Sequence, residues 1–531
     1  MSAPLLRHRT LPAIAALLLG TGLLVGSTTA AITATGAVSP SPPQYGDQII
    51  VGYGGYGTLQ IDGGFQFHSS YARIGENSTG FGKATVTGSG SRWTINNAAV
   101  GAQGVGRLEI RDGGVVEVQS GQLQVGNSQF GNGTVVVEGP GSLLNLNTYL
   151  GLAANGGTAA LEISSGAMVN LGANYGVQVG PGGRIQLRGG DLRAAGISND
   201  GIIRGSGEIE GVYNNSSNNR GRIEVAVGDR LSIGMNTGGM FSNHGELAVR
   251  GGELEFAALK NDIEGEAEGT ITLQNGVLRA GLVSSNSGQP QLINRSLIAA
   301  VDGESHVHGH VRNEQGGTIT VTNESLAIFH NRVESVTDST ISVYPGSTAI
   351  FLDDLVLNGG TLLADLVGAA EFGHVEVVGD LYLDGVLQVD FGDQYSPQAG
   401  DSFSIMSVAG GITGALNVSA LSEMPAGLNL KVAVESHALA LNVVLAGDFN
   451  FDGSVDAADY TVWRDARQSG NVAADGNNDG SVDNVDLEIW KAHFGATSGG
   501  SAALAVPEPG TGSLLLALLG MAAITARLPI R

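Results

Sequence analysis

Acidic side chains crowd into one short segment near the end of a chain in which only 14% of residues are charged. Counted from Asp448, oxygen-bearing side chains stand at positions 1, 3, 5, 9 and 12, with Gly453 at position 6, where the chain must turn sharply. These donors are Asp448, Asn450, Asp452, Asp456 and Asp459, and Ser454 at position 7 can add its backbone carbonyl. A flexible ring of hard oxygen donors suits Ca²⁺ better than a transition metal. The spacing therefore predicts a calcium site.

The same spacing returns 27 residues later, so the predicted site is duplicated. The second set is Asp475, Asn477, Asp479, Ser481, Asp483 and Asp486, with Gly480 at position 6. Both sets follow the ligand schedule of an EF-hand loop. Each precedes a short predicted helix, in which Tyr460 matches Leu487 and Trp463 matches Trp490. Carboxylates in one loop repel each other without metal, so we expect two Ca²⁺ ions whose binding is coupled to folding. The alternative is an acidic, turn-rich linker.

Residues 446–496 resemble a type I dockerin, the duplicated calcium-binding module that docks onto cohesin domains in cellulosome-like assemblies. The resemblance rests on the paired loops, on aspartate at position 12 and on the recurring basic residues Arg464 and Lys491. Loop positions 10 and 11, often Ser-Thr in well-known cellulosomal dockerins, are Ala457-Ala458 and Asn484-Val485 here. The resemblance implies a cohesin-like or other envelope protein as partner, with Arg464 and Lys491 at the rim of the contact.

The composition of the remaining chain indicates a repetitive, β-rich structure. Of 531 residues, 84 are Gly and only 5% are aromatic, yet 42% are hydrophobic, which is too apolar for a disordered Gly-rich linker. The formal net charge of −24 argues against nucleic acid as a partner, because phosphate binding needs clustered Lys and Arg. No cysteine is present, so stability must come without disulfides.

Internal repeats with a period near 25 residues predict the fold. Apolar pairs recur in steps of 24 to 27 residues, and most are followed by a small-residue turn, a second apolar pair and an apolar residue before Gly. The first pairs are Leu59/Ile61, Ala84/Val86, Leu108/Ile110, Val135/Val137, Leu161/Ile163 and Ile185/Leu187. Three short strands per unit, which bury their apolar faces only when units stack, predict a mainly β fold, a right-handed parallel β-helix. We expect regular repeats at 45–200 and a degenerate continuation at 201–360, marked by Asn-x-Gly turns.

Residues 361–445 depart from this period. The segment LYLDGVLQV predicts a hairpin around Asp384-Gly385, and SFSIMSV and LALNVVL supply further strands. We therefore expect a small β module that caps the solenoid.

The regular repeats resemble those shared by autotransporter passengers and PEP-CTERM proteins. The resemblance is carried by phrases such as IGENSTGFGKATVTGSGSRW and VGAQGVGRLEIRDGGVV. It implies a surface adhesin or matrix component with a β-helical stem.

Both ends of the chain have the character of export signals. Residues 1–31 combine a basic start, an apolar run and small residues, as in a secretory signal peptide. After a linker at 497–506, residues 507–531 place Pro507-Glu508-Pro509 before a short apolar run. This tail resembles the PEP-CTERM sorting signal of Gram-negative bacteria, which implies transient membrane association, removal by an exosortase, and delivery to the surface or its exopolysaccharide. The alternative is an ordinary membrane anchor, for which the run is short.

Two further clusters are candidates for catalysis or metal binding. His306, His308 and His310 share one face of a predicted strand and could ligate zinc, although an exposed polar face is the simpler interpretation. Glu264, Glu266 and Glu268 could form a carboxylate pair or a solvated edge. Carboxylates adjacent on one face lack the opposed geometry of glycosidase pairs, which favours the edge.

These patterns favour a non-catalytic exported protein of the cell surface or extracellular matrix, a β-helical stalk or adhesin with a calcium-dependent docking module. The regular coils and the scarcity of lysine, only Lys83 and Lys260 before residue 361, favour this function. The alternative is a polysaccharide-degrading lyase or hydrolase of a dockerin-bearing, cellulosome-like system. The fold alone does not decide between them.

Overall fold

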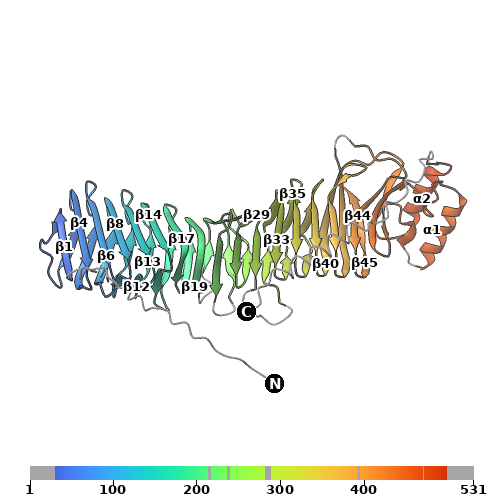
Figure 1. Cartoon of the computed structure of the whole chain (residues 1–531). Coiled ribbons are helices and arrows are strands. Elements are labelled where there is room, and N and C mark those ends of the chain that lie inside the picture. The colour runs from blue at the N-terminus through green and yellow to red at the C-terminus, as the bar shows by residue number, and fades with distance from the viewer. Residues whose placement is uncertain are drawn as a thin grey trace, which may run out of the picture.

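The chain forms an elongated rod in the computed structural model, which describes residues 30–212, 217–235, 239–281, 289–392, 395–469 and 472–498. Strand β1 (Ala31–Gly36) lies at one end, and helices α1 (Ala457–Ser469) and α2 (Asn484–His493) lie at the other (Figure 1). No helix in these ranges is long and apolar enough to cross a membrane. The expected sorting tail, and all but residues 30 and 31 of the expected signal peptide, lie outside the described residues.

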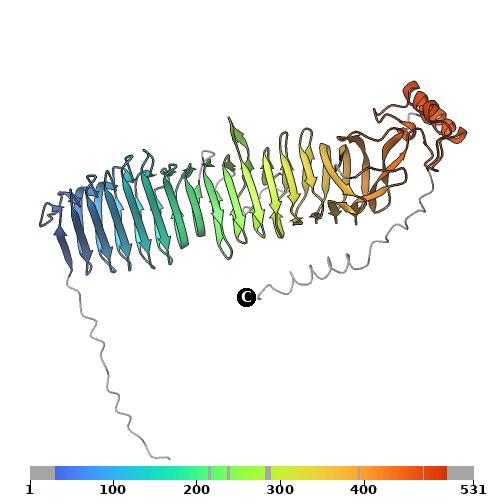
Figure 2. The same cartoon turned by 90° about the horizontal axis from the view of Figure 1, so that it is seen from above.

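Each coil of the rod contains three short strands, as the repeats predict. One coil consists of β8 (Val105–Arg111), β9 (Val115–Val118) and β10 (Leu123–Val125), and the next places β11 (Asn132–Glu138), β12 (Leu143–Leu146) and β13 (Leu150–Leu152) over them. All three pairings are parallel and in register. Stacking of this kind forms a β-solenoid with three faces, and the turned view shows the strands running across its axis (Figure 2).

The three faces run nearly the whole length of the rod. Besides β8 and β11, the first face contains β4 (Tyr56–Asp62), β6 (Phe81–Thr87), β14 (Thr158–Ser164), β17 (Gly183–Arg193), β19 (Ile202–Val212), β21 (Arg222–Val225), β24 (Glu246–Arg250), β29 (Thr270–Gln274), β32 (Leu297–Val301), β35 (Thr318–Thr322), β38 (Thr340–Val343), β40 (Leu355–Gly368), β43 (Leu381–Phe391) and β45 (Ile412–Ala420). Besides β9 and β12, the second contains β5 (Gln66–Ile74), β7 (Arg92–Val100), β15 (Met168–Leu171), β22 (Arg230–Met235), β25 (Glu253–Phe256), β30 (Val277–Ala280), β33 (Glu304–His308), β36 (Leu326–Phe329), β39 (Thr348–Phe351), β42 (His374–Val377) and β44 (Ser402–Val408). Besides β10 and β13, the third contains β3 (Gln48–Val51), β16 (Gly176–Val179), β18 (Gly196–Asn199), β20 (Asn218–Asn219), β23 (Phe241–Asn243), β26 (Leu259–Asn261), β31 (Leu292–Asn294), β34 (Val311–Asn313) and β37 (Val333–Val336). Long strands such as β5, β17 and β40 contribute to two faces.

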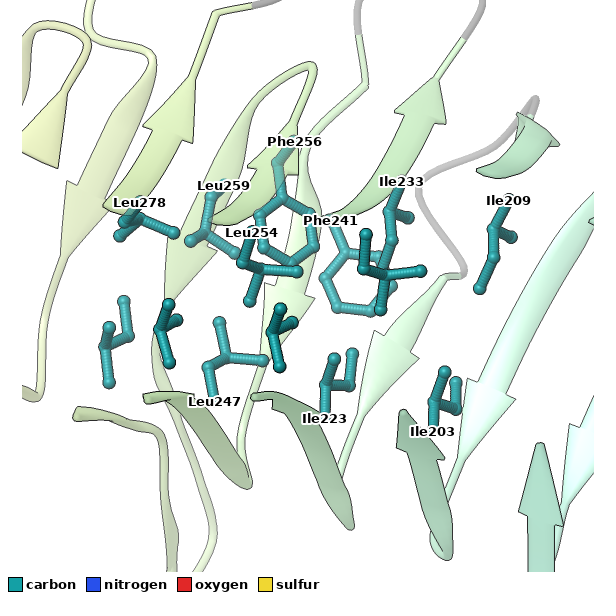
Figure 3. Packing of buried hydrophobic residues seen from close by; sticks show 14 of the residues in the cluster. Ile203, Ile209, Ile223, Ile233, Phe241, Leu247, Leu254, Phe256, Leu259 and Leu278 are labelled. Atoms are coloured by element: carbon teal, nitrogen blue, oxygen red, sulfur yellow. The ribbon is translucent and has the colours of Figure 1, made fainter. Parts of the chain in front are cut away.

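Columns of apolar side chains fill the interior. Ile203, Ile223 and Leu247 occupy the same register in three successive coils, and all three are fully buried. Figure 3 shows these side chains pointing into the interior from facing strands. Burying an aliphatic side chain contributes roughly 1.5–3 kcal/mol. A single coil cannot do this alone, so each coil is stabilised by its neighbours.

Glycines at the corners let successive coils come close together. Gly75 and Gly101 both have positive φ, 72° and 69°. A Cβ at Gly75 would lie 2.3 Å from Val105 O, and one at Gly101 would lie 2.3 Å from Asn132 O. These corners therefore require glycine both for backbone conformation and for space.

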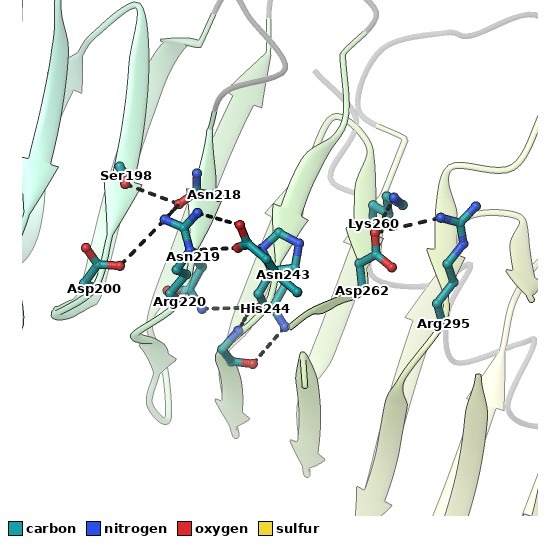
Figure 4. A network of polar contacts seen from close by, with 12 residues as sticks. Ser198, Asp200, Asn218, Asn219, Arg220, Asn243, His244, Lys260, Asp262 and Arg295 are labelled. Carbon is teal, nitrogen blue, oxygen red and sulfur yellow. Dashed lines mark hydrogen bonds and ion pairs between the residues drawn. The ribbon is translucent and has the colours of Figure 1, made fainter. Parts of the chain in front are cut away.

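A ladder of buried asparagines runs along the interior from the point where the repeats become degenerate. The asparagine ladder comprises Asn199, Asn219, Asn243, Asn261, Asn294 and Asn313, all fully buried. Each Nδ2 donates to the Oδ1 of the next member, at distances of 2.6 to 2.8 Å. Asn199 also accepts from Gly201 N at 3.2 Å, which forms the expected Asn-x-Gly turn. Outside the ladder, Arg220 donates to Glu264. Arg220 also lies near Asp200 (Figure 4).

The rod ends differ from the repeating coils. β1 and β4 pair antiparallel, as do β2 (Val38–Ser39) and β3, and these strands close the first end. At the other end β46 (Leu428–Val434) and β47 (Ala438–Leu445) pair antiparallel with each other, and β47 also pairs with β44. Two short hairpin additions are β27 (Ile263–Glu264) with β28 (Ala267–Glu268), and β41 (Glu371–Phe372) beside β40.

The hairpin expected around Asp384-Gly385 is wrong. β43 is one continuous strand that runs through both residues and pairs parallel with β40 and β45. A neighbouring coil on each side satisfies this backbone, so the Asp-Gly pair need not turn. The solenoid therefore continues from residue 361 to β45, and the antiparallel cap is limited to β44, β46 and β47.

We predict that Asn243→Ala lowers the free energy of unfolding by roughly 1–3 kcal/mol, because Asn219 Nδ2 loses its ladder acceptor and Asn261 Oδ1 loses its ladder donor. Urea denaturation followed by circular dichroism measures the change. Asn132→Ala, at an exposed strand position, is the matched control and should be nearly neutral. Equal midpoints for both variants would contradict a stabilising ladder.

Candidate functional site

The first acidic loop is closed by hydrogen bonds from its own backbone. Gly453 N donates to Asp448 Oδ2 at 2.9 Å, and Ser454 N donates to Asp452 Oδ1 at 2.9 Å. Asn450 Oδ1 accepts from Asp452 N at 3.0 Å. Gly453 has a φ of 85°, as expected for the sharp turn at position 6. The predicted ligand positions 1, 3 and 5 therefore form one compact turn.

The second loop repeats these bonds at equivalent positions. Gly480 N donates to Asp475 Oδ2 at 2.8 Å, and Ser481 N donates to Asp479 Oδ1 at 2.9 Å. Asn477 Oδ1 accepts from Asp479 N at 3.1 Å. Gly480 has a φ of 86°. The duplication seen in the sequence is therefore also a duplication of geometry.

The acids at positions 9 and 12 begin the two helices. Asp483 is the N-cap of α2, and its side chain forms a capping box with Asp486. In the first loop, Asp456 Oδ1 accepts from Ala458 N at 2.7 Å, while Asp459 Oδ2 accepts from Asp456 N at 2.8 Å. Negative side chains are favourable at helix N-termini because of the exposed amides there. Helix capping is thus a second role for these four acids, which the spacing of calcium ligands alone does not indicate.

Two tryptophans join the loops to each other. Trp463 Nε1 of α1 donates to Asp483 O at 2.8 Å, and Trp490 Nε1 of α2 donates to Asp456 O at 2.8 Å. Each helix is therefore bonded to position 9 of the other loop. Trp463 is buried, and Tyr460 packs against both indoles. The reciprocal bonds make the two loops and helices one unit, which we call the paired-loop module (residues 446–498).

One buried carboxylate oxygen in this module, Asp448 Oδ1, accepts no hydrogen bond. Asp448 is only 4% exposed, and its Oδ1 has no hydrogen-bond partner. Burial raises the pKa of Asp448, and the nearby carboxylates of Asp459 and Asp452 raise it further, while the amides of Gly453 and Phe451 lower it. An unpaired buried oxygen at position 1 fits a site that is completed by a cation. As the side chains lie, no three or more acidic or histidine groups in the described ranges are arranged to hold a metal ion.

The second loop lies against the antiparallel cap. Asn429 Nδ2 of β46 donates to Gly476 O at 2.7 Å, and Asn478 Nδ2 donates to Asn429 Oδ1 at 3.0 Å. Lys431 Nζ donates to Asn478 Oδ1 at 2.8 Å and to Asp475 O. Burial lowers the pKa of Lys431, and the nearby carboxylates of Asp475 and Asp486 oppose this. The module is therefore joined to the rod through a partly buried polar contact.

The basic residues expected at a partner's rim remain on the surface. Arg464 and Lys491 are both 50% exposed. Each is paired within its own helix, Arg464 with Asp465 at 2.8 Å and Lys491 with Glu488 at 2.7 Å. Both are thus accessible to a second protein.

The histidine and glutamate clusters lie on the solenoid wall. His306 Nδ1 is 3.0 Å from His330 Nε2, and His308 stacks on His330 with ring centroids 3.8 Å apart. Stacked rings do not direct their nitrogens at one point, and His310 is not part of this group. His330 belongs to the next coil, so only the coil register could have added it to the cluster. Glu264, Glu266 and Glu268 lie exposed on the β27–β28 hairpin, where Glu264 binds Arg220.

Comparisons with known proteins do not assign the chain to a family. No family model matches the chain. The uncharacterized lipoprotein YdeK of Escherichia coli (strain K12) is 26% identical over 321 residues, which are 52% of this chain and 24% of that protein. The chain thus spans about a quarter of that relative's length. Among solved structures, a TibC-catalyzed hyper-glycosylated TibA fragment matches 70% of this chain and 99% of its own at 14% identity, with a TM-score of 0.30.

We predict that the stacked histidines make the rod less stable in mild acid. Burial lowers the pKa of His308 to about 3 and that of His330 to about 4, with His306 and Arg279 adding to the shift. Because the unfolded chain binds more protons between about pH 6.5 and pH 4, the folded state loses stability as pH falls through that range.

The measurement is the urea midpoint at pH 7.5 and pH 4.5 for the wild type and for His308→Gln with His330→Gln. We expect the wild type to lose more between the two pH values than the double variant. Parallel losses would show that other groups, among them the partly buried His374, account for the pH dependence.

Proposed function

We propose that this chain is a non-catalytic, exported stalk whose terminal paired-loop module binds two Ca²⁺ ions and holds a partner at the cell surface. The observation that carries the proposal is the set of backbone hydrogen bonds shared by the two loops together with the unpartnered, buried Asp448 Oδ1. A lipoprotein among the relatives and the export signals expected at both ends of the sequence support an envelope or surface location. The sorting tail and its processing by an exosortase are part of the same proposal.

The residues that would hold calcium are the side chains at positions 1, 3, 5, 9 and 12 of each loop and the carbonyls of Ser454 and Ser481. A bound Ca²⁺ would supply positive charge that offsets the mutual repulsion of the aspartates and orders the loops. The chain's own backbone amides already orient one oxygen each of Asp448, Asp452 and Asp479, and both oxygens of Asp475. The loop acids also cap α1 and α2, so ion binding would favour the helices as well.

We propose no catalytic role for the histidine and glutamate clusters. The imidazoles stack on each other, and the glutamates lie on an exposed hairpin rather than on opposite walls of a cleft. A polysaccharide-degrading activity is the alternative, and it would have to use other residues.

We predict that the calcium-free full-length chain binds two Ca²⁺ ions in isothermal titration calorimetry. Asp452→Ala should weaken the first site by roughly 10- to 100-fold, and Asp479→Ala should do the same at the second, because each removes a charged ligand. Asp465→Ala, on α1 but outside both loops, is the matched control. No binding heat, or a single site in the wild type, would refute the proposal.

A second role is favoured by the contacts of the module with β46. Because Lys431 and Asn429 bind the second loop, the module can serve as a cap for the end of the solenoid without any external partner. The two roles are compatible, since α1 and α2 keep Arg464 and Lys491 exposed. The two roles differ in whether removal of calcium releases the chain from the cell surface.

We predict that a calcium chelator releases the full-length chain from its native cell surface, because the helices that present Arg464 and Lys491 depend on the loops. The double variant Arg464→Ala with Lys491→Ala should lower the rate of attachment and the salt dependence of that rate. It should change the lifetime of the attached complex less. Immunoblots of cell and medium fractions measure release. Retention of the chain in chelator, with a lowered thermal midpoint, would leave the cap as the module's role and exclude calcium-dependent docking.

A further inference from the structure

A groove of about 540 Å³ crosses the third face of the solenoid in its regular part, far from the paired-loop module. It lies over β10, β13, β16 and β18 and over the turns beside them. Its polar lining residues are Gln122, Gln124, Tyr149, Asn155, Asn174, Gln178 and Ser198. No lining residue carries a formal charge, although the chain as a whole has a net charge of −24. The groove therefore suits an uncharged, hydrogen-bonding ligand.

The centre of the groove is a notch left by a glycine. Gln124, Gly151 and Gln178 are in register on three successive coils, so their positions form one outward column. Gly151 supplies no side chain between the two glutamines, which stand two coils apart, about 10 Å. Each primary amide offers both donors and an acceptor. Gln124 uses one N–H on Gln122 Oε1 at 2.7 Å and keeps its own carbonyl oxygen for a ligand.

One aromatic ring, that of Tyr149, lines the groove beside this notch. Tyr149 is 54% exposed and meets Tyr175 of the next coil edge to face, with centroids 5.3 Å apart and an interplanar angle of 83°. Tyr175 in turn packs over Gly172, where an added Cβ would lie 3.4 Å from its ring. Tyr149 is thus held in place, and little side-chain entropy would be lost on binding. An amphipathic ring beside amides is suited to the apolar face and hydroxyl edge of a sugar.

The backbone in the groove is not free to bind a peptide strand. β10 pairs with β7 and β13, β13 with β16, β16 with β18, and β18 with β20. With both edges of these strands occupied, strand addition is excluded here, and recognition must use side chains. A ligand would therefore depend on the side-chain amides, on the tyrosine ring and on the uncharged notch between them.

We propose that this groove binds a neutral oligosaccharide chain, with Gln124 and Gln178 bonding its hydroxyls and Tyr149 stacking on a sugar ring. This goes beyond the calcium-dependent docking proposed above and depends only on the chain's being outside the cell. It would give the rod a second, calcium-independent attachment, to a polysaccharide.

The test is affinity electrophoresis of the full-length chain in native gels containing dextran, galactomannan or mixed-linkage β-glucan, with alginate and polygalacturonate as acidic polymers and a chelator throughout. We expect at least one neutral polymer to retard the chain. Tyr149→Ala should weaken retardation at least about tenfold, by loss of stacking. Gly151→Gln should abolish it by filling the notch, and the backbone tolerates this change because an added Cβ meets only Ala154 Cβ, at 3.5 Å.

Tyr45→Ala is the matched control, because Tyr45 is 78% exposed and lies outside the groove. Circular dichroism and thermal midpoints confirm that all three variants fold. Retardation by acidic polymers alone, by no neutral polymer, or equally in Gly151→Gln and the wild type would overturn the proposal. Because calcium is absent from these gels, failure here is distinct from failure of the calcium titration.

Discussion

Registered stacking of one coil on the next is the interaction on which this structure depends. Each residue of a coil lies about 4.8 Å from its counterpart in the coil before, so the whole chain behaves as a set of columns. The side chains that follow one another in a column must therefore be able to pack against each other. Inside the rod that means apolar on apolar, or amide on amide as in the asparagine ladder. Outside it means that charges must alternate or be offset, as where Glu109 lies among Lys83, Arg107 and Arg111.

This constraint explains which parts of the fold could be predicted from sequence. The apolar pairs, the glycine corners and the three strands per unit repeat visibly, so the parallel solenoid follows from the period. The Asp384-Gly385 pair was misleading because its turn propensity is local, whereas the pairing that overrides it comes from two neighbouring coils. His330 was missed for a related reason: contacts between coils join residues more than twenty positions apart, and only an assigned register brings His330 beside His306 and His308.

In the paired-loop module, the local sequence is informative and the tertiary contacts are what the sequence does not show. Its donor spacing is local, so the two loops could be recognised directly from the sequence, and the structure gives them equivalent turns. Calcium binding by the twelve predicted positions stays a prediction. What spacing could not show is the environment: the reciprocal bonds of Trp463 and Trp490, the helix caps, and the contact with Asn429 and Lys431. Those features decide whether the module acts alone or as part of the rod, and they depend on tertiary contacts rather than on the loop motif.

The asparagine ladder also gives the rod a direction. Every amide along it donates toward the C-terminal end and accepts from the N-terminal side, so the dipoles are aligned head to tail and can polarise one another. Because each member presents the same donor and the same acceptor, any coil in this stretch can follow any other. A gene could therefore lengthen or shorten the rod by duplicating or deleting whole coils, and the ladder would close again over the junction. The length of the rod is in that sense an adjustable property, separable from the structure of either end.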